Sequence, residues 1–174
     1  MSGTSVSTPA TAGYFGLFFQ MWADGVFAGT PGLNRDVFAA RPHMTTAKAV
    51  MINTAYQYPF SGTGADMTRT HQGWGRVDIQ NAYDLAVNGH MPLIIDETSI
   101  IKPFETHSYS FNVQNNSCAT RATLVYADPM GNPAASQHRI NDLSLKLISP
   151  SGTIYWGNNG LPTGNWSTAG GQSN

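Results

Sequence analysis

Ser5 is the residue of this chain whose type and position are best suited to chemistry. It follows Gly3, which permits a sharp backbone turn, and it precedes a long run of small and apolar residues that predicts a helix. A serine at a helix start lies beside free backbone N–H groups and the positive end of the helix dipole. These groups stabilise the oxyanion that develops in acyl transfer. The pattern therefore allows two interpretations of Ser5: a nucleophile, or a simple helix cap, which is the commoner role.

The helices around this serine can be predicted from their periodicity and capping residues. The helix that follows Ser5 has large apolar residues on all sides between residues 15 and 22, so we expect it to be buried. A second helix should begin with a threonine cap at residue 45 or 46 and run to about residue 56. A third should be capped by Asp78 and span residues 79–87. Turn residues separate these segments.

Three segments resemble the subtilisin-like serine proteases. Residues 3–9, Gly-Thr-Ser-Val-Ser-Thr-Pro, match the serine motif of that family, Gly-Thr-Ser-x-x-x-Pro, at every fixed position. Residues 47–55, Ala-Lys-Ala-Val-Met-Ile-Asn-Thr-Ala, resemble the structural helix that follows the serine helix, and residues 73–77 resemble a Gly-x-Gly-x-Val segment. The resemblance implies that Ser5 is the catalytic nucleophile and that its own N–H is one donor of the oxyanion hole.

The order of the triad predicts that other catalytic groups come from outside this sequence. In subtilisin the order is Asp, His, Ser, whereas every aspartate, glutamate and histidine of this chain follows Ser5. The resemblance also places the oxyanion-hole asparagine before the serine. We therefore expect a fragment that lacks the N-terminal part of its catalytic domain and is inactive alone. An inactive gene remnant is the alternative.

A different class of serine hydrolase could use the opposite order. The α/β-hydrolases run Ser, acid, His, and histidines at positions 71, 90, 107 and 138 follow Ser5 here. Their nucleophile elbow needs Gly-x-Ser-x-Gly, but Ser7 stands where the second glycine belongs. The sequence therefore disfavours this class, and His71 is best interpreted as a loop histidine.

The second half of the chain has the pattern of a β-rich domain. Short β-branched and aromatic runs at 93–95, 108–113, 121–126, 143–148 and 153–156 are separated by turn residues. Residues 122–129, 140–145 and 149–158 resemble the P-domain-like β-domain attached to some subtilisin-like proteases. The fold class predicted is α/β, the C-terminal helical part of a subtilisin-like catalytic domain (residues 1–90), followed by an incomplete all-β jelly-roll or sandwich (residues 91–174).

Oxygen-bearing side chains near the expected strand ends are candidate calcium ligands. They are Asp128, Asn141, Asp142, Asn158 and Asn159. Calcium sites are built from such carboxylate and carbonyl oxygens, and the resemblance permits a structural Ca²⁺. The spacing matches no self-contained calcium loop, and turn formation is the commoner role of these residues.

Composition limits the partners and the compartment. The formal net charge is −1, with no basic tract, which disfavours binding to nucleic acid or an anionic membrane. The single cysteine, Cys118, excludes an internal disulfide, and no stretch is apolar enough to span a membrane. Charged residues make up 11%, which suits a secreted protein, although no signal peptide precedes the motif.

Two functions from different classes follow from these patterns. The first is a secreted serine endopeptidase that cleaves polypeptides and needs no cofactor for its chemistry. The second is a non-catalytic β-sandwich interaction module.

Overall fold

The computed structural model describes residues 3–27, 36, 38–59, 69–91, 94, 100–113 and 119–171. The chain divides into two compact units. The first unit comprises Met1–Thr54 and Val77–Arg121, and the second comprises Ala55–Arg76 and Ala122–Asn174. Each unit therefore contains two separate stretches of the sequence. The expected domain boundary between residues 90 and 91 stays a prediction.

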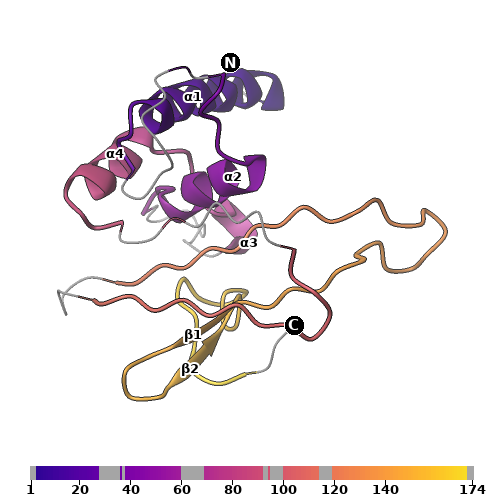
Figure 1. Ribbon diagram of the computed structural model, residues 1–174. Helices are drawn as coiled ribbons and strands as arrows, with labels where there is room; N and C mark the ends of the chain where they lie inside the picture. Colours follow the sequence, from indigo (N-terminus) through magenta and orange to yellow (C-terminus); the bar gives the residue numbers. More distant parts are fainter. Residues whose placement is uncertain are drawn as a thin grey trace. The chain divides into compact units, whose positions relative to one another are not determined.

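The first unit is built from helices α1 (Thr4–Ala23), α2 (Met44–Asn53) and α4 (Ile79–Val87) (Figure 1). Both α1 and α2 contact α4. The apolar side chains that meet there form the core of this unit. Its buried members are Phe18, Trp22, Phe27, Ala47, Val50, Met51 and Ala82.

The third predicted helix and its cap are confirmed. Helix α4 spans Ile79–Val87, and the Asp78 carboxylate accepts a hydrogen bond of 3.1 Å from the Asn81 N–H. The cap predicted for the second helix is wrong. Helix α2 begins at Met44 after an extended His43, with no side-chain cap. Thr46 is instead buried within the helix, because it lies on the side of α2 that also buries Ala47 and Val50.

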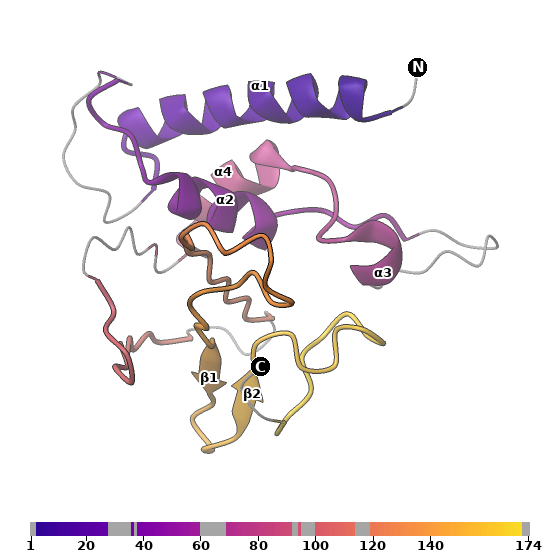
Figure 2. The ribbon, with the colours of Figure 1, turned by 90° about the vertical axis from the view of Figure 1, so that its right-hand side faces the viewer.

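The burial predicted for the serine helix is wrong over most of its length. The buried residues of α1 are Phe18, Trp22 and Ala23, all near its C-terminal end. Leu17 directly precedes Phe18 in the sequence but is 55% exposed. One stripe near the end of α1 packs into the core of this unit, and Figure 2 shows the helix extending beyond α2 and α4. A helix that is apolar on all sides is buried only when neighbours surround it.

Replacing Gly16 with alanine should stabilise this chain. Gly16 lies inside α1, and a Cβ added there would meet no other atom within 4 Å. Glycine in a helix interior costs about 0.5–1 kcal/mol relative to alanine, mainly through chain entropy. We expect Gly16→Ala to raise the free energy of unfolding by about that amount in urea denaturation. A lower free energy of unfolding in Gly16→Ala would show that other residues pack against this face of α1.

The second unit contains α3 (Arg69–Gln72), β1 (Lys146–Ile148) and β2 (Ile154–Trp156). The two strands are antiparallel, with Leu147 opposite Tyr155. The turn between them is closed by the Ser149 N–H, which donates to the Thr153 carbonyl at 2.9 Å. Lys146 lies over the ring of its cross-strand partner Trp156, 5.5 Å from the ring centroid.

The predicted jelly-roll or sandwich is wrong for the part of the chain that the structure describes. There β1 and β2 form a sheet of two strands. Residues 108–113 and 121–126 belong to no strand. The predicted strand at 93–95 falls mostly outside the described residues. The predicted α/β class fails as well, because no sheet accompanies the helices of the first unit over the described ranges. Alternating apolar residues favour an extended backbone, but a strand also needs a partner in register.

Candidate active site at the start of the first helix

Ser5 lies in the first turn of α1, as predicted from the sequence. The residue that precedes the helix, Gly3, has φ of 123° and ψ of 169°. This conformation is open to glycine and strained for residues with a Cβ. Gly3 therefore sets the direction in which the chain enters the helix, and Ser5 follows at once.

The side-chain hydrogen bonds in this turn are made by Ser7 and not by Ser5 in the part of the chain that the structure describes. The Gly3 carbonyl accepts from the Val6 N–H at 3.1 Å and from the Ser7 N–H at 3.3 Å. The Ser7 hydroxyl lies 3.4 Å from the carbonyl oxygens of both Gly3 and Thr4. The Ser5 side chain is exposed and makes no hydrogen bond within the described ranges. The Ser5 side chain therefore does not cap α1, which was the second interpretation that the sequence allowed.

The backbone beside Ser5 offers donors for an anion. The N–H groups of Thr4 and Ser5 lie in the first turn, where an α-helix has no acceptors for them. They lie at the positive end of the dipole of α1, which has 20 residues. This arrangement can stabilise negative charge next to the Ser5 hydroxyl.

Pro9 leaves the Ser5 carbonyl without its usual helical partner. It lies inside α1, beyond the tolerated first turn, where a proline has no N–H to donate to the residue four positions earlier. That residue is Ser5. The helical hydrogen bond from the N–H of position 9 to the carbonyl of position 5 therefore cannot form.

The described residues do not assemble a catalytic triad around Ser5. No histidine bonds its hydroxyl in this part of the chain. His71 is exposed on α3 in the second unit, and His107 lies 3.8 Å from Glu105. Neither supports the α/β-hydrolase alternative. Within the described ranges, Ser5 therefore has an exposed hydroxyl beside backbone N–H groups, and no histidine is hydrogen-bonded to it.

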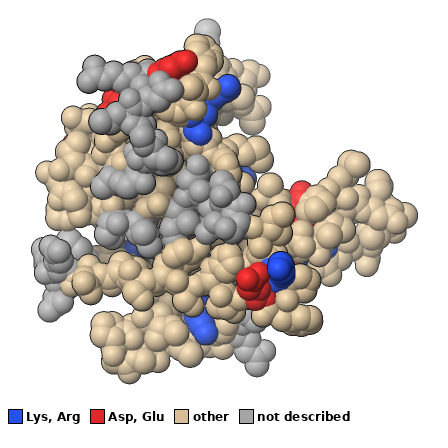
Figure 3. All heavy atoms as spheres, in the orientation of Figure 1, with Lys and Arg blue, Asp and Glu red and all other residues tan. Residues whose placement is uncertain are grey.

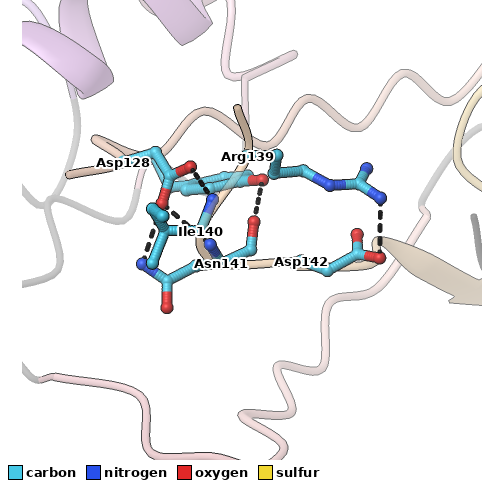
Figure 4. Close-up of polar contacts among 6 residues, drawn as sticks. Asp128, Arg139, Ile140, Asn141 and Asp142 are labelled. Atoms are coloured by element: carbon cyan, nitrogen blue, oxygen red, sulfur yellow. Dashed lines mark hydrogen bonds and ion pairs between the residues drawn. The ribbon is translucent and has the colours of Figure 1, made fainter. Parts of the chain in front are cut away.

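The candidate calcium ligands form hydrogen bonds within the second unit (Figure 4). The Asp128 carboxylate accepts from the Ile140 N–H at 2.8 Å, and from the Asn141 N–H and amide side chain at 2.9 and 2.8 Å. Asp142 pairs with Arg139 at 2.9 Å. Donors that point at both oxygens of Asp128 occupy the positions where a cation would bind.

The remaining candidates have turn-forming roles. Asn158 has a positive φ of 65°, and the Asn159 amide donates to the Thr168 carbonyl at 2.9 Å and the Gly170 carbonyl at 3.2 Å. In the described ranges, no group of three or more His, Cys, Asp or Glu side chains is arranged to hold a metal ion. This geometry does not fit a calcium cage, and structural calcium stays a prediction.

Acid should weaken the loop that Asp128 organises. The hydrogen bond from Ile140, followed by those from Asn141, holds the pKa of Asp128 below its ordinary value of 3.8. A lowered pKa contributes stability that is complete above pH 3.8 and is lost as the pH falls through the folded-state pKa. We expect the amide resonances of Ile140 and Asn141 to shift together in an NMR titration below pH 3.8. In the Asp128→Asn variant these two resonances should not shift over the same pH range. If the variant showed the same titration curve as the parent chain, Asp128 would not be the group that causes the shifts.

The sequence is distantly similar to part of a much longer protein. The chain is 28% identical over 157 residues to the serine protease/ABC transporter B family protein tagA of Dictyostelium discoideum. The match covers 86% of this chain and 8% of that protein. No protein-family model matches the sequence, and no solved structure matches it. The chain is thus weakly similar to part of a protein named as a serine protease, and the subtilisin-like assignment goes beyond this similarity.

No helix in the described ranges is long and apolar enough to cross a membrane.

Proposed function

We propose that this chain supplies the nucleophile Ser5 to a subtilisin-like serine endopeptidase. The observation that carries the proposal is the position of Ser5. Its exposed, unpaired hydroxyl lies in the first turn of α1 directly after the glycine turn. The weak similarity to a protein named as a serine protease supports the broader class. The match of residues 3–9 to the serine motif supports the finer one.

The proposed mechanism is acyl transfer through Ser5. A histidine takes the proton of the Ser5 hydroxyl as its oxygen attacks the peptide carbonyl. The carbonyl oxygen becomes an oxyanion, which the Ser5 N–H and an asparagine side chain stabilise. The amine product leaves with a proton from the histidine. Water then hydrolyses the acyl-enzyme and regenerates Ser5.

The histidine, the aspartate that orients it and the asparagine are proposed to come from a part of the protein outside this sequence. Two observations support this division. Over the described ranges no histidine bonds the Ser5 hydroxyl. Most of α1 is also exposed, with open space beside Gly13 and Gly16. Those positions leave room for another element to pack on the serine helix.

Polypeptides are the proposed substrates and the extracellular space the proposed location. Charged residues make up 11% of the chain, below the roughly 25% of an average soluble domain. Figure 3 shows few charged side chains on the face that it draws, and among the residues described there neither positive nor negative side chains form a wide patch.

The alternative function, a non-catalytic β-sandwich module, is not supported, because the described residues contain no sandwich.

A fluorophosphonate probe tests the proposal, because it labels only serines that a base activates. We expect no labelling of this chain alone. A longer protein that also carries the missing histidine and aspartate should be labelled at Ser5, and peptide mapping should find the adduct there. Strong labelling of this chain alone would contradict the proposed source of the base. An adduct on another serine of the longer protein would overturn the assignment of Ser5.

A further inference from the structure

The second unit contains an exposed arginine whose guanidinium lies over two tyrosine rings. The Arg76 guanidinium carbon lies 5.3 Å from the ring centroid of Tyr56 and 5.1 Å from that of Tyr58. The two rings meet edge to face, with centroids 5.3 Å apart. Tyr56 lies in an isolated β-bridge, and the ring contact places the Tyr56 and Tyr58 side chains on the same face of this segment. Together these side chains form an arginine–tyrosine cluster of Tyr56, Tyr58 and Arg76.

Backbone contacts hold the arginine–tyrosine cluster in place. Tyr56 and Arg76 form an isolated antiparallel bridge, and each N–H donates to the other carbonyl at 2.9 Å. The Gln72 side chain accepts from the Tyr58 N–H at 2.9 Å and donates to the Tyr58 carbonyl at 2.6 Å. Gly75, at φ of 103°, lets the chain pass so close that an added Cβ would lie 2.7 Å from the Tyr56 carbonyl carbon. The cluster is therefore preorganised.

The arginine–tyrosine cluster presents apolar surface and a positive charge that no acidic side chain pairs with among the described residues. Arg76 is exposed, and its guanidinium N–H groups have no hydrogen-bond acceptor or acidic partner within the described ranges. Residues 55–59 and 69–76 contain Arg69 and Arg76 but no aspartate or glutamate. Tyr56 is 41% exposed and Tyr58 43% exposed.

We propose that the arginine–tyrosine cluster binds a carboxylate side chain of a polypeptide. A planar guanidinium binds a carboxylate through two parallel N–H···O bonds, and the cation–π contacts with the two rings hold that guanidinium in position. The exposed rings provide contact area for the apolar residues beside the carboxylate, which a free inorganic anion would not use. A nucleic acid is disfavoured because the chain has a formal net charge of −1 and no basic tract. This proposal does not depend on the role of Ser5.

The test compares two capped peptides, Leu-Glu-Leu-Glu-Leu and Leu-Gln-Leu-Gln-Leu, which differ only in their carboxylates. The 174-residue chain is titrated with each peptide while the Arg76 Nε–H resonance is followed by NMR. We expect saturable shifts with the glutamate peptide and roughly tenfold weaker binding of the glutamine peptide. Arg76→Lys keeps the charge and the backbone bridge but loses the fork, so it should weaken glutamate-peptide binding by roughly tenfold.

Arg41→Lys is the matched control. Arg41 also lies over an aromatic ring, 5.9 Å from the Phe38 centroid, but its Nε already donates to the Phe38 carbonyl at 2.9 Å. This variant should bind the glutamate peptide as the parent chain does. Equal affinity for the two peptides, or an unchanged affinity in Arg76→Lys, would overturn the proposal. Tighter binding of inorganic phosphate or single-stranded DNA at the Arg76 resonance would overturn it as well. The peptide comparison needs no variant, so it remains decisive if Arg76→Lys fails to fold.

Discussion

Ser5→Ala should abolish peptide hydrolysis by the serine endopeptidase proposed above. We expect kcat to fall by roughly 10⁴- to 10⁶-fold with little change in KM, which is the scale of loss when triad residues are removed from subtilisin. The physical reason is that the substrate still binds, whereas the covalent step has no attacking oxygen. Steady-state kinetics on a peptide substrate, with burst-phase measurement of the acyl-enzyme, provide the test.

Ser7→Ala is the control for this prediction. The Ser7 hydroxyl lies in the same turn of α1 and contacts the Gly3 and Thr4 carbonyls at 3.4 Å. Its loss should change kcat by less than about fivefold, because it removes one weak, exposed side-chain contact. Near-normal activity of Ser5→Ala, or a greater loss in Ser7→Ala, would show that Ser5 is not the nucleophile.

Phe18→Ala should cause the largest loss of stability in the first unit. Phe18 is fully buried, and its ring centroid lies 5.2 Å from Phe27 and 6.0 Å from Trp22. Truncation removes apolar contacts and leaves a cavity that the surrounding helices fill only in part. Such changes in well-packed cores cost about 3–5 kcal/mol. We expect that decrease in the free energy of unfolding, measured by urea denaturation with tryptophan fluorescence.

Leu17→Ala provides the comparison on the same helix. Leu17 is 55% exposed, so its truncation should cost less than about 1 kcal/mol. Equal losses in the two variants would contradict the orientation of α1 described here. A small loss in Phe18→Ala would mean that the core of α1, α2 and α4 is not closely packed around this ring.

The elements that the sequence predicts well are those whose causes are local. Helix α4 has Asp78 as its cap and Asn88 just beyond its end, and both ends lie where the sequence indicates. The Gly3 turn and the first turn of α1 depend on residues within a few positions of one another. Helical hydrogen bonds join residues four apart, so nearby side chains decide where a helix begins.

The predictions that failed depend on contacts between distant residues. Alternation at 108–113 predicts a strand, but no partner pairs with it in the described part of the chain. Lys146–Ile148 and Ile154–Trp156 do pair, because a short turn brings them together. The cluster of Tyr56, Tyr58 and Arg76 was not predicted. The spacing of the two tyrosines shows that they share a face, but no local signal identifies Arg76 as their partner.

By itself, the sequence determined that Ser5 begins a helix directly after a glycine turn. It also determined which chemistry such a position can support, since the helix dipole and the free N–H groups are local properties. The tertiary structure decided which side of α1 is buried, which extended segments pair, and that Arg76 rests on Tyr56 and Tyr58. The physical reason is that burial and strand pairing require partners distant in sequence, and no short-range pattern specifies which partner will be in reach.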